Sequence, residues 1–450
     1  MFSSLAITAP FLLAGLQAVS VDAIQTISAV GAKFFYENGT QYYIKGVAYQ
    51  LTPDDPLTDE AQCKRDIVRM SELGANAIRV YHVDASADHQ GCMDAFADAG
   101  IYLFVDLDTF TTAIDQTSPH WNETQYERFG AVFDEFQQYN NTAGVFVGNE
   151  VLDTAEGSIA APYVLAAARD MKAYRDKKGY REIPVGYSAA DIASLRPMLQ
   201  NYMACMPKAA DRLDFYSLNA YEWCGESSYT VSGYDELQKN ATGYPIPIFF
   251  SETGCNTPAP RTFDDQAAIL GDDMDGTWSG AIIYEWIEET NDYGLISYGA
   301  YVTNAAATNT LVEDGYTRQG TPTPVSPDFS NLLSQWATLN PTGVALSAYT
   351  AETSTITART CPSSTADGWA VDPSSSLPTL GQTYSKDSAD STGTGTSGSN
   401  STATSSGSSS TSTSKSAANS VMVAGNLATE RLFAVSMLLT GAVGVAAFWL

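Results

Sequence analysis

The chain has 450 residues, of which 44% are hydrophobic and 16% charged, and its formal net charge is −28 at pH 7. Phosphate binding requires clustered Lys and Arg, so this acidic balance argues against a nucleic-acid partner. The hydrophobic content allows a sizeable core, and the composition divides the chain into a globular region, about 24–345, and a polar tail.

The N-terminus has the pattern of a targeting segment. An apolar run over 9–16 is followed by small residues. This predicts a secretory signal over 1–20, cleaved at about 20–23, although the usual Lys or Arg is missing from its start.

From residue 41 onward, apolar segments alternate with helical patterns, which is typical of a parallel sheet with crossover helices. Thr58 is the expected N-cap of the first helix, whose buried side comprises Ile67, Val68, Met70 and Leu73 and which stops at Gly74. Further helices are predicted over 91–99, 125–138, 163–174 and 330–338. Strands are predicted over 42–48, 77–81, 101–107, 144–150, 183–188, 214–219, 246–251 and 281–286. Eight strands in about 245 residues predict a (β/α)8 TIM barrel.

Two of these strands end in a carboxylate. The run 144–150 ends in Asn149-Glu150, and the run 246–252 ends in Ser251-Glu252. Barrel enzymes place catalytic residues at the carboxyl ends of their strands, and a spacing of 102 residues fits three βα units of roughly 30–35 residues. One carboxylic acid and one carboxylate are what glycosidic bond cleavage requires, so Glu150 and Glu252 predict sugar chemistry. The distance between them would decide between retention and inversion, and the sequence leaves this open.

Other residues near the predicted strand ends have two interpretations. Glu222 and Glu285 follow strand-like runs, but we interpret them as partners of Arg or as rim residues. His82 is interpreted as a hydrogen-bonding residue, and Asn149 as a candidate for binding a sugar hydroxyl. Core packing explains a single aromatic residue, but six of them favour a sugar-binding groove: Tyr81, Tyr221, Trp223, Tyr284, Trp286 and Tyr293.

The tail has three compositional segments. Residues 346–384 form a polar extension, and 385–418 are dominated by Ser, Thr and Gly, a composition that predicts a disordered or O-glycosylated stalk. The apolar end, preceded by small residues, predicts a GPI-attachment signal over 419–450 with the lipid on Asn419. A C-terminal transmembrane anchor is the alternative.

Six cysteines and three histidines show no metal-binding spacing, so we expect disulfides and no metal. We expect no organic cofactor either, because cleavage by two carboxyl groups uses only proton transfer and a carboxylate nucleophile. Spacing alone leaves fifteen disulfide pairings open. N-glycosylation sequons occur at Asn38, Asn122, Asn140, Asn240 and Asn400.

Several motifs in combination resemble one known family. They are Ile44-Lys45-Gly46-Val47-Ala48-Tyr49-Gln50, Arg79-Val80-Tyr81, Gly148-Asn149-Glu150, Tyr221-Glu222-Trp223-Cys224-Gly225 and Ser251-Glu252-Thr253-Gly254-Cys255. Over about 24–345 the chain resembles the fungal β-1,3-glucanosyltransferases of glycoside hydrolase family 72, which are GPI-anchored enzymes that remodel cell-wall glucan. Only Cys361 follows the barrel in this sequence, so we expect the chain to lack the cysteine-rich glucan-binding module that some members carry.

The resemblance implies a retaining reaction with Glu150 as acid/base and Glu252 as nucleophile. It implies sugar contacts from Gln50, Tyr81, Asp106, Asn149, Tyr221, Tyr284 and Tyr293, of which the last three are candidates for the acceptor side. It also implies the disulfides Cys63–Cys92, Cys224–Cys255 and Cys205–Cys361, the last of which would tie the extension to the barrel.

The function that the resemblance implies is internal cleavage of a β-1,3-glucan chain and transfer of the new reducing end to the non-reducing end of another chain. The expected partners are donor and acceptor glucans and, through the lipid anchor, the outer face of the plasma membrane, with the cell wall as a further location; we expect a monomer. The alternatives are an endo-β-1,3-glucanase and a non-catalytic cell-wall structural or binding protein.

Overall fold

A computed structural model describes residues 23–303, 311–352, 357–366 and 368–385. All described residues belong to one compact unit. The predicted signal peptide, nearly all of the predicted stalk, the lipid-attachment signal, Asn400 and Asn419 lie outside the described residues.

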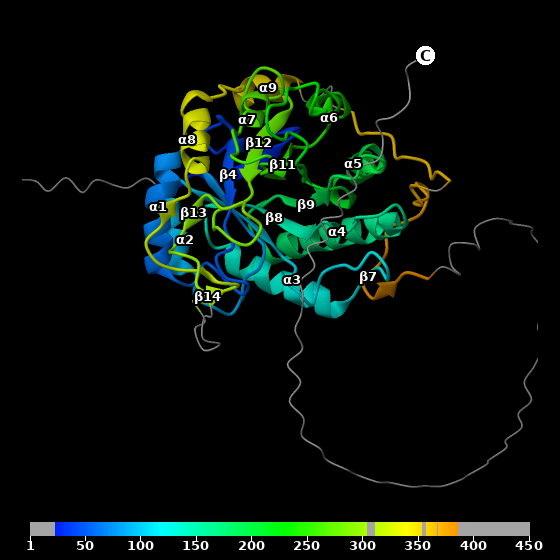
Figure 1. Cartoon of the computed structure of the whole chain (residues 1–450). Coiled ribbons are helices and arrows are strands. Elements are labelled where there is room, and N and C mark those ends of the chain that lie inside the picture. Colours follow the sequence, from blue (N-terminus) through cyan, green and yellow to red (C-terminus); the bar gives the residue numbers. More distant parts are fainter. Residues whose placement is uncertain (1–22, 304–310, 353–356, 367, 386–450) are drawn as a thin grey trace, which may run out of the picture. The chain divides into compact units, whose positions relative to one another are not determined.

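Eight parallel strands close into a barrel, which confirms the predicted fold. Neighbouring strands pair in sequence order, and the last strand pairs with the first. Helices lie on the outside of this barrel (Figure 1). The strands are β4 (Ile44–Ala48), β5 (Ala77–Val80), β6 (Tyr102–Asp106), β8 (Thr142–Asn149), β9 (Val185–Ala190), β10 (Phe215–Asn219), β11 (Ile248–Thr253) and β12 (Trp278–Ile283).

The crossover helices include three that the sequence pattern did not indicate, namely α5 (Arg196–Cys205), α6 (Tyr234–Ala241) and α7 (Asp265–Ile269). Each is short, with ten residues or fewer, so its apolar periodicity is weak. The described helices are α1 (Glu60–Leu73), α2 (Gln90–Asp98), α3 (Glu123–Phe136), α4 (Ala161–Lys178), α5 (Arg196–Cys205), α6 (Tyr234–Ala241), α7 (Asp265–Ile269), α8 (Asp328–Thr338) and α9 (Leu346–Glu352).

Two details of the first helix differ from prediction. The N-cap of α1 is Asp59 and not Thr58, because the Asp59 carboxylate accepts a hydrogen bond from the backbone N–H of Gln62 at 3.0 Å. Val68 is 65% exposed, whereas Met70 and Leu73 are buried. The buried stripe follows the helical repeat through Met70 and Leu73, and Val68 lies outside that stripe.

Two predicted strands are shifted along the chain. The fifth strand begins after Pro184, which has no N–H to donate to the sheet. The eighth strand spans Trp278–Ile283 and ends where Ile283 pairs with Val47 of β4. Tyr284 and the residues after it therefore lie in the loop beyond the strand.

An antiparallel sheet closes the amino-terminal end of the barrel. It consists of β1 (Ile27–Val30), β2 (Lys33–Tyr36) and β3 (Gln41–Tyr42), which leads directly into β4. The Phe34 ring lies 6.1, 5.9 and 6.0 Å from the rings of Phe104, Phe215 and Phe249 inside the barrel. This apolar plug leaves polar residues to occupy the opposite end.

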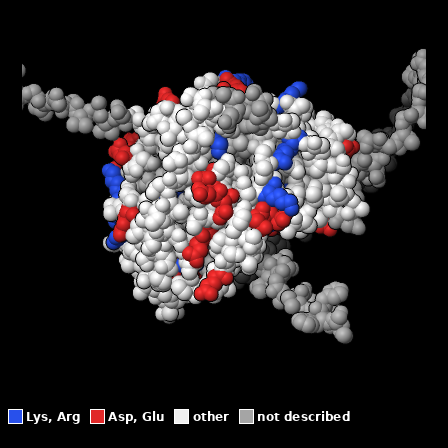
Figure 2. Space-filling model, turned by 90° about the horizontal axis from the view of Figure 1, so that it is seen from above, with Lys and Arg blue, Asp and Glu red and all other residues white. Residues whose placement is uncertain are grey.

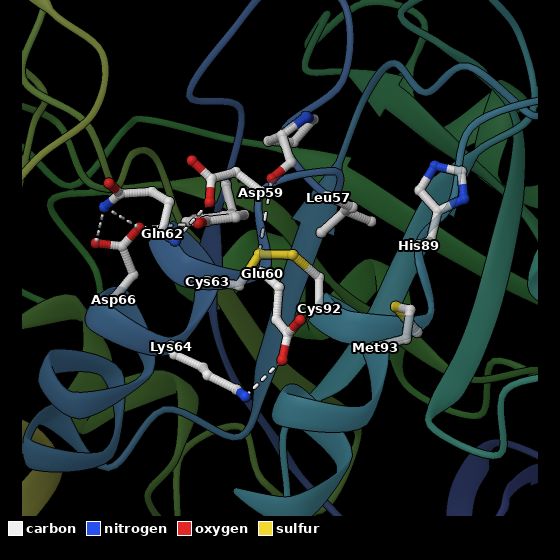
Figure 3. The surroundings of a disulfide bond; sticks show 12 residues. Leu57, Asp59, Glu60, Gln62, Cys63, Lys64, Asp66, His89, Cys92 and Met93 are labelled. Carbon is white, nitrogen blue, oxygen red and sulfur yellow. Dashed lines mark hydrogen bonds and ion pairs between the residues drawn. A yellow bond between two sulfur atoms is a disulfide. The ribbon is translucent and has the colours of Figure 1, made fainter.

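Three disulfides fasten the loops and helices around the barrel, and they are the pairs that the resemblance implied. Cys63–Cys92 joins α1 to α2 (Figure 3). Cys224–Cys255 joins the loops that follow β10 and β11. Cys205–Cys361 joins α5 to the C-terminal extension.

The described parts of the extension pack on the barrel. Trp369 is fully buried, and its ring lies 5.3 Å from that of Tyr202 on α5. Farther on, β17 (Gln382–Thr383) pairs antiparallel with β7 (His120–Trp121). The disulfide therefore reinforces a packed interface.

Candidate active site

The two glutamates predicted to be catalytic lie at the carboxyl end of the barrel, on the fourth and seventh strands. Glu150 follows β8 directly and is exposed, and its backbone turns there with φ 48°, in the left-handed region. Its N–H donates to the carbonyl of Ser188 on β9 at 2.8 Å. Glu252 lies near the end of β11 and is 8% exposed. One carboxylate is thus open to solvent and the other is enclosed.

Three donors hold the enclosed carboxylate of Glu252. The hydroxyl of Tyr81 donates to Oε1 and the hydroxyl of Tyr221 donates to Oε2, each at 2.9 Å. Arg79 Nη1 lies 3.3 Å from Oε1. The pKa of Glu252 is raised to about 7, chiefly by burial and also by the nearby charge of Glu150. The Arg79 charge and the two tyrosine hydroxyls act in the opposite direction and lower this pKa. The donors therefore stabilise the ionised form that a nucleophile requires.

Arg79 lies at the centre of the polar layer beneath the site. Its side chain is fully buried and forms a two-point pair with Asp106, with Nε–Oδ1 at 3.1 Å and Nη2–Oδ2 at 2.9 Å. Its guanidinium lies 4.5 Å from the ring centre of Phe146 and 4.3 Å from that of Tyr81. Asp106, at 2% exposure, lies beneath the floor of the site, where it orients Arg79.

Asn219 links the two strands that carry Glu150 and Glu252. Its Nδ2 donates to Glu150 Oε1 at 2.8 Å and to Asn149 Oδ1 at 3.0 Å. Its Oδ1 accepts from the hydroxyls of Ser188 at 2.9 Å and Ser251 at 2.8 Å. Because the Asn149 carbonyl oxygen also accepts from Arg79 at 2.9 Å, one continuous hydrogen-bond network joins Glu150 to Glu252.

Sequence reasoning did not assign roles to four members of this network. Arg79, Ser188, Asn219 and Ser251 are polar residues in the carboxyl-terminal halves of buried strands. That position is the signal that could have identified them, because a polar side chain at a strand end of a barrel points towards the site.

The predicted aromatic residues divide into two groups. The rings of Tyr221, Tyr284 and Tyr293 meet edge to face, with centroids 5.4 to 6.4 Å apart. Arg261 holds this cluster from behind, since its guanidinium donates to the carbonyl oxygens of Tyr284 at 2.8 Å and Tyr293 at 2.6 Å. Together with Tyr81 they form one wall around Glu252.

Trp286 belongs to the core and not to a groove, which corrects the prediction for it, whereas Trp223 is only partly buried. Trp286 is fully buried and donates its indole N–H to the Tyr298 hydroxyl at 2.9 Å. The Trp223 ring packs on Tyr234 with centroids 5.2 Å apart. Apolar packing therefore explains the position of Trp286, and it covers only part of the Trp223 side chain.

Gln50 and His82 form the adjoining turn. Gln50 Oε1 accepts from the backbone N–H groups of Tyr81 at 2.9 Å and His82 at 3.1 Å, so it fixes this turn. The His82 ring lies against that of Phe110, with centroids 3.8 Å apart and ring planes tilted by 33°. Burial, with a smaller effect from the Arg79 charge, lowers the pKa of His82 to about 4, so this ring is neutral at pH 7.

The other two strand-end glutamates have structural partners. Glu222 accepts from Arg196 at 2.9 Å, as predicted. Glu285 is 4% exposed and accepts from Asn291 Nδ2 at 2.7 Å. Burial, together with the neighbouring charge of Glu289, raises its pKa to about 8. Its carboxyl therefore acts as a neutral anchor for the loop that carries Tyr293.

Surface charge and composition add little further chemistry. On the face in Figure 2, acidic side chains gather near the middle, and Lys and Arg lie apart from one another or beside acidic groups. Within the described ranges, no group of three or more His, Cys, Asp or Glu is placed to hold a metal ion. Over the same part of the chain, no helix has both the length and the apolar character needed to cross a membrane.

A closed (β/α)8 barrel with paired carboxylates at the ends of its fourth and seventh strands is an architecture of enzymes that cleave glycosidic bonds. Comparison with known proteins narrows this class. The chain belongs to the glucanosyltransferase family, glycoside hydrolase family 72, whose family model matches residues 16–313.

Named relatives agree with this assignment. The chain is 40% identical over 362 residues to 1,3-beta-glucanosyltransferase gas2 of Schizosaccharomyces pombe. The matched region covers 77% of this chain and 74% of that protein. It is 39% identical over 358 residues to Protein EPD1 of Candida maltosa, and this match covers 78% of this chain. The chain spans about three-fifths of the length of EPD1, with 61% covered.

A solved structure shares the fold. Gas2p of Saccharomyces cerevisiae in complex with laminaripentaose matches with a TM-score of 0.69 and 37% identity. The match covers 77% of this chain and 75% of that one.

Proposed function

We propose that this protein is a retaining β-1,3-glucanosyltransferase that cleaves a β-1,3-glucan internally and transfers the new reducing end to the non-reducing end of a second chain. The observation that carries the proposal is the Glu252 carboxylate, whose two oxygens each accept a tyrosine hydroxyl, in one network with the exposed Glu150. The family assignment and the laminaripentaose bound to Gas2p support β-1,3-glucan as the substrate.

In the first step, Glu252 attacks the anomeric carbon of the donor and Glu150 gives its proton to the leaving glycosidic oxygen. The bond between the sugars breaks, a glycosyl ester forms on Glu252, and the released chain carries the proton as a new hydroxyl. Tyr81 and Tyr221 hold the attacking carboxylate in one orientation, which lowers the entropic part of the barrier.

In the second step, the Glu150 carboxylate takes the proton of an acceptor hydroxyl, whose oxygen attacks the same anomeric carbon and displaces Glu252. Two inversions at that carbon restore the β configuration. Transfer exceeds hydrolysis when a bound sugar hydroxyl is present at a higher effective concentration than water.

The sugar contacts are assigned on the same basis. We place donor and acceptor sugars against Tyr81, Asn149, Tyr221, Tyr284 and Tyr293, which line the enclosed carboxylate or adjoin Glu150. Gln50 and Asp106 act as positioning residues, because their side chains hold the Tyr81–His82 turn and Arg79, respectively.

The proposed setting is the outer face of the plasma membrane or the cell wall, reached through the secretory route and a lipid on Asn419, with a monomer as the working unit. Among the sequons, Asn38 and Asn140 are exposed and Asn122 and Asn240 are partly exposed. All four are therefore open to glycosylation, and Asn400 remains a prediction from sequence.

The test is the product distribution from laminari-oligosaccharides with reduced ends. A transferase gives products longer than the substrate. Exclusive appearance of shorter products would assign an endo-β-1,3-glucanase instead. Full biological effect retained by Glu252→Gln would favour a non-catalytic wall protein.

A further inference from the structure

A hollow of about 930 Å³ lies at the amino-terminal end of the barrel, the end opposite to Glu150 and Glu252. We name it the amino-terminal groove. Its size is at the upper end of the roughly 300–1,000 Å³ typical of ligand pockets. The segment before β1, helix α2, the start of β6 and the turn between α3 and β8 form its lining, which includes Ile24, Gln25, Tyr36, Asp94, Asp98 and Asn140.

Asn140 lines the groove and also begins the sequon Asn140-Asn141-Thr142. Its side chain is exposed. The next residue is anchored, because Asn141 is 2% exposed and its Nδ2 donates to the carbonyl oxygens of Met93 at 3.1 Å and Ile101 at 3.3 Å. A glycan on Asn140 would therefore start from a fixed point at the edge of the groove.

The groove has an aromatic wall. Tyr36 is half-buried, and its ring packs on those of Tyr42 and Tyr102 with centroids 5.2 and 6.0 Å apart. The Tyr102 hydroxyl donates to the carbonyl oxygen of Gln25 at 2.7 Å, which holds the segment before β1 in place beside Tyr36. The C–H groups of a pyranose ring pack well on an apolar aromatic surface of this kind.

The polar residues of the groove suit an uncharged sugar. Asp94, Asp98 and Gln138 are exposed along it, and the lining contains no Lys or Arg among the described residues. Sugar hydroxyls and the amide N–H of N-acetylglucosamine donate to carboxylates, and the acetyl oxygen accepts from a side-chain amide. An anionic ligand would instead be repelled by the two carboxylates.

The covalent tether selects the occupant. A sugar attached to a lining residue has an effective concentration in the millimolar range, so weak contacts suffice to hold it there. We propose that the innermost N-acetylglucosamine residues of an N-glycan on Asn140 pack in the amino-terminal groove against Tyr36 and stabilise this end of the barrel. This rests on the proposed glycosylation of Asn140 and is independent of the transfer reaction.

The test uses the full chain secreted from a eukaryotic host, with glycopeptide mass spectrometry to measure occupancy of Asn140. Thermal midpoints are compared for the unmodified protein, Asn140→Gln and Asn240→Gln. Asn240 is a partly exposed sequon residue on α6 that does not line the groove, so it is a matched control. The same variants from the periplasm of a bacterium without N-glycosylation measure the substitutions alone.

We expect Asn140→Gln to lower the thermal midpoint of the glycosylated protein by roughly 2–4 °C, and to leave that of the bacterial protein unchanged. Asn240→Gln should change neither. In a Tyr36→Leu background the loss caused by Asn140→Gln should disappear, because the two changes remove the same contact. Hydrogen exchange in peptides covering 97–102 should be faster in glycosylated Asn140→Gln than in the unmodified glycoprotein, a readout that needs neither the bacterial protein nor Tyr36→Leu.

The contrary outcomes are equally specific. An unoccupied Asn140, or equal midpoints and equal exchange with and without its glycan, would overturn the proposal. A loss of the same size in the Tyr36→Leu background would place the glycan outside the groove. Calorimetric binding of a free laminari-oligosaccharide to the unmodified glycoprotein that Tyr36→Leu abolishes would show that the groove is open to other sugars, and would also overturn it.

Discussion

The substitution Tyr221→Phe isolates one hydrogen bond to the proposed nucleophile. It removes the hydroxyl that donates to Glu252 Oε2 at 2.9 Å and leaves the ring, and therefore its edge contacts with Tyr284 and Tyr293, in place. A hydrogen bond to a charged group contributes about 1.5–3 kcal/mol. Because one pKa unit corresponds to about 1.4 kcal/mol, the pKa of Glu252 should rise by roughly one to two units.

The sign follows from the charge state that the hydroxyl stabilises. Tyr221 donates to the ionised carboxylate, so its loss favours the protonated form, which cannot attack. The acidic limb of the pH profile of kcat/KM should therefore move to higher pH by about one to two units. At pH values well below that limb, kcat/KM of Tyr221→Phe should be roughly ten- to a hundredfold lower than that of the unmodified protein.

The assay is kcat/KM for a laminari-oligosaccharide across pH, with Tyr202→Phe as control. Tyr202 lies on α5 and is buried against Trp369 of the C-terminal extension, so its hydroxyl is not one of the donors to Glu252. Its substitution should therefore leave the pH profile unchanged. An unshifted acidic limb in Tyr221→Phe, or a shift to lower pH, would refute the assignment of this hydroxyl to the nucleophile.

Three further predictions concern stability and support of the site. Replacing both Cys205 and Cys361 by Ser, which removes a bridge across a sequence separation of 156 residues, should lower the free energy of unfolding by about 2–5 kcal/mol; an unchanged thermal midpoint would show that packing alone holds the extension. Asp106→Asn should cost about 3–5 kcal/mol in urea unfolding and reduce kcat, because Arg79 loses its two-point partner; unaltered stability and rate would contradict that support. His89→Gln should lower the free energy of unfolding more at pH 5.5 than at pH 8. Equal losses at the two pH values would contradict the ion pairs of protonated His89 with Asp55 and Glu135.

The sign for His89 follows from those surroundings. Burial acts to lower the pKa of His89, but hydrogen bonds and charges from Asp55 and Glu135, at 2.8 and 2.9 Å, outweigh it and raise the pKa. A raised pKa adds stability that is complete below the unfolded value of about 6.5 and is lost as the pH rises through the folded value. Figure 3 shows His89 near the disulfide that joins α1 to α2.

The barrel and the strands that carry Glu150 and Glu252 were predictable from local pattern. Continuous apolar runs identified β8 and β11, and a parallel barrel places the carboxyl ends of all its strands at one end, so the sequence predicts that Glu150 and Glu252 lie together. The register of β12 could not be predicted, because closure against β4 sets where it ends. This error placed Trp286 at a strand end, although it packs in the core.

The supports of the site were the least predictable part. Arg79 and Asn219 lie on strands far apart in sequence, and their contacts with Asp106, Glu252 and Glu150 exist only after the barrel closes. Local sequence contains no information on which polar strand-end residues face one another. The N-terminal sheet was also missed, because its strands are two to four residues long and give almost no periodic signal.

The most direct test of the central claim is to trap the covalent intermediate on Glu252. A Glu150→Gln variant supplied with a laminari-oligosaccharyl fluoride needs no acid for the first step, because fluoride is a good leaving group, but it lacks the base for the second. Mass spectrometry of the digested protein should then find the sugar on Glu252, in the peptide that contains β11, and addition of azide should release it as a β-glycosyl azide. No adduct, an adduct on another residue, or an α-configured azide product would contradict the account.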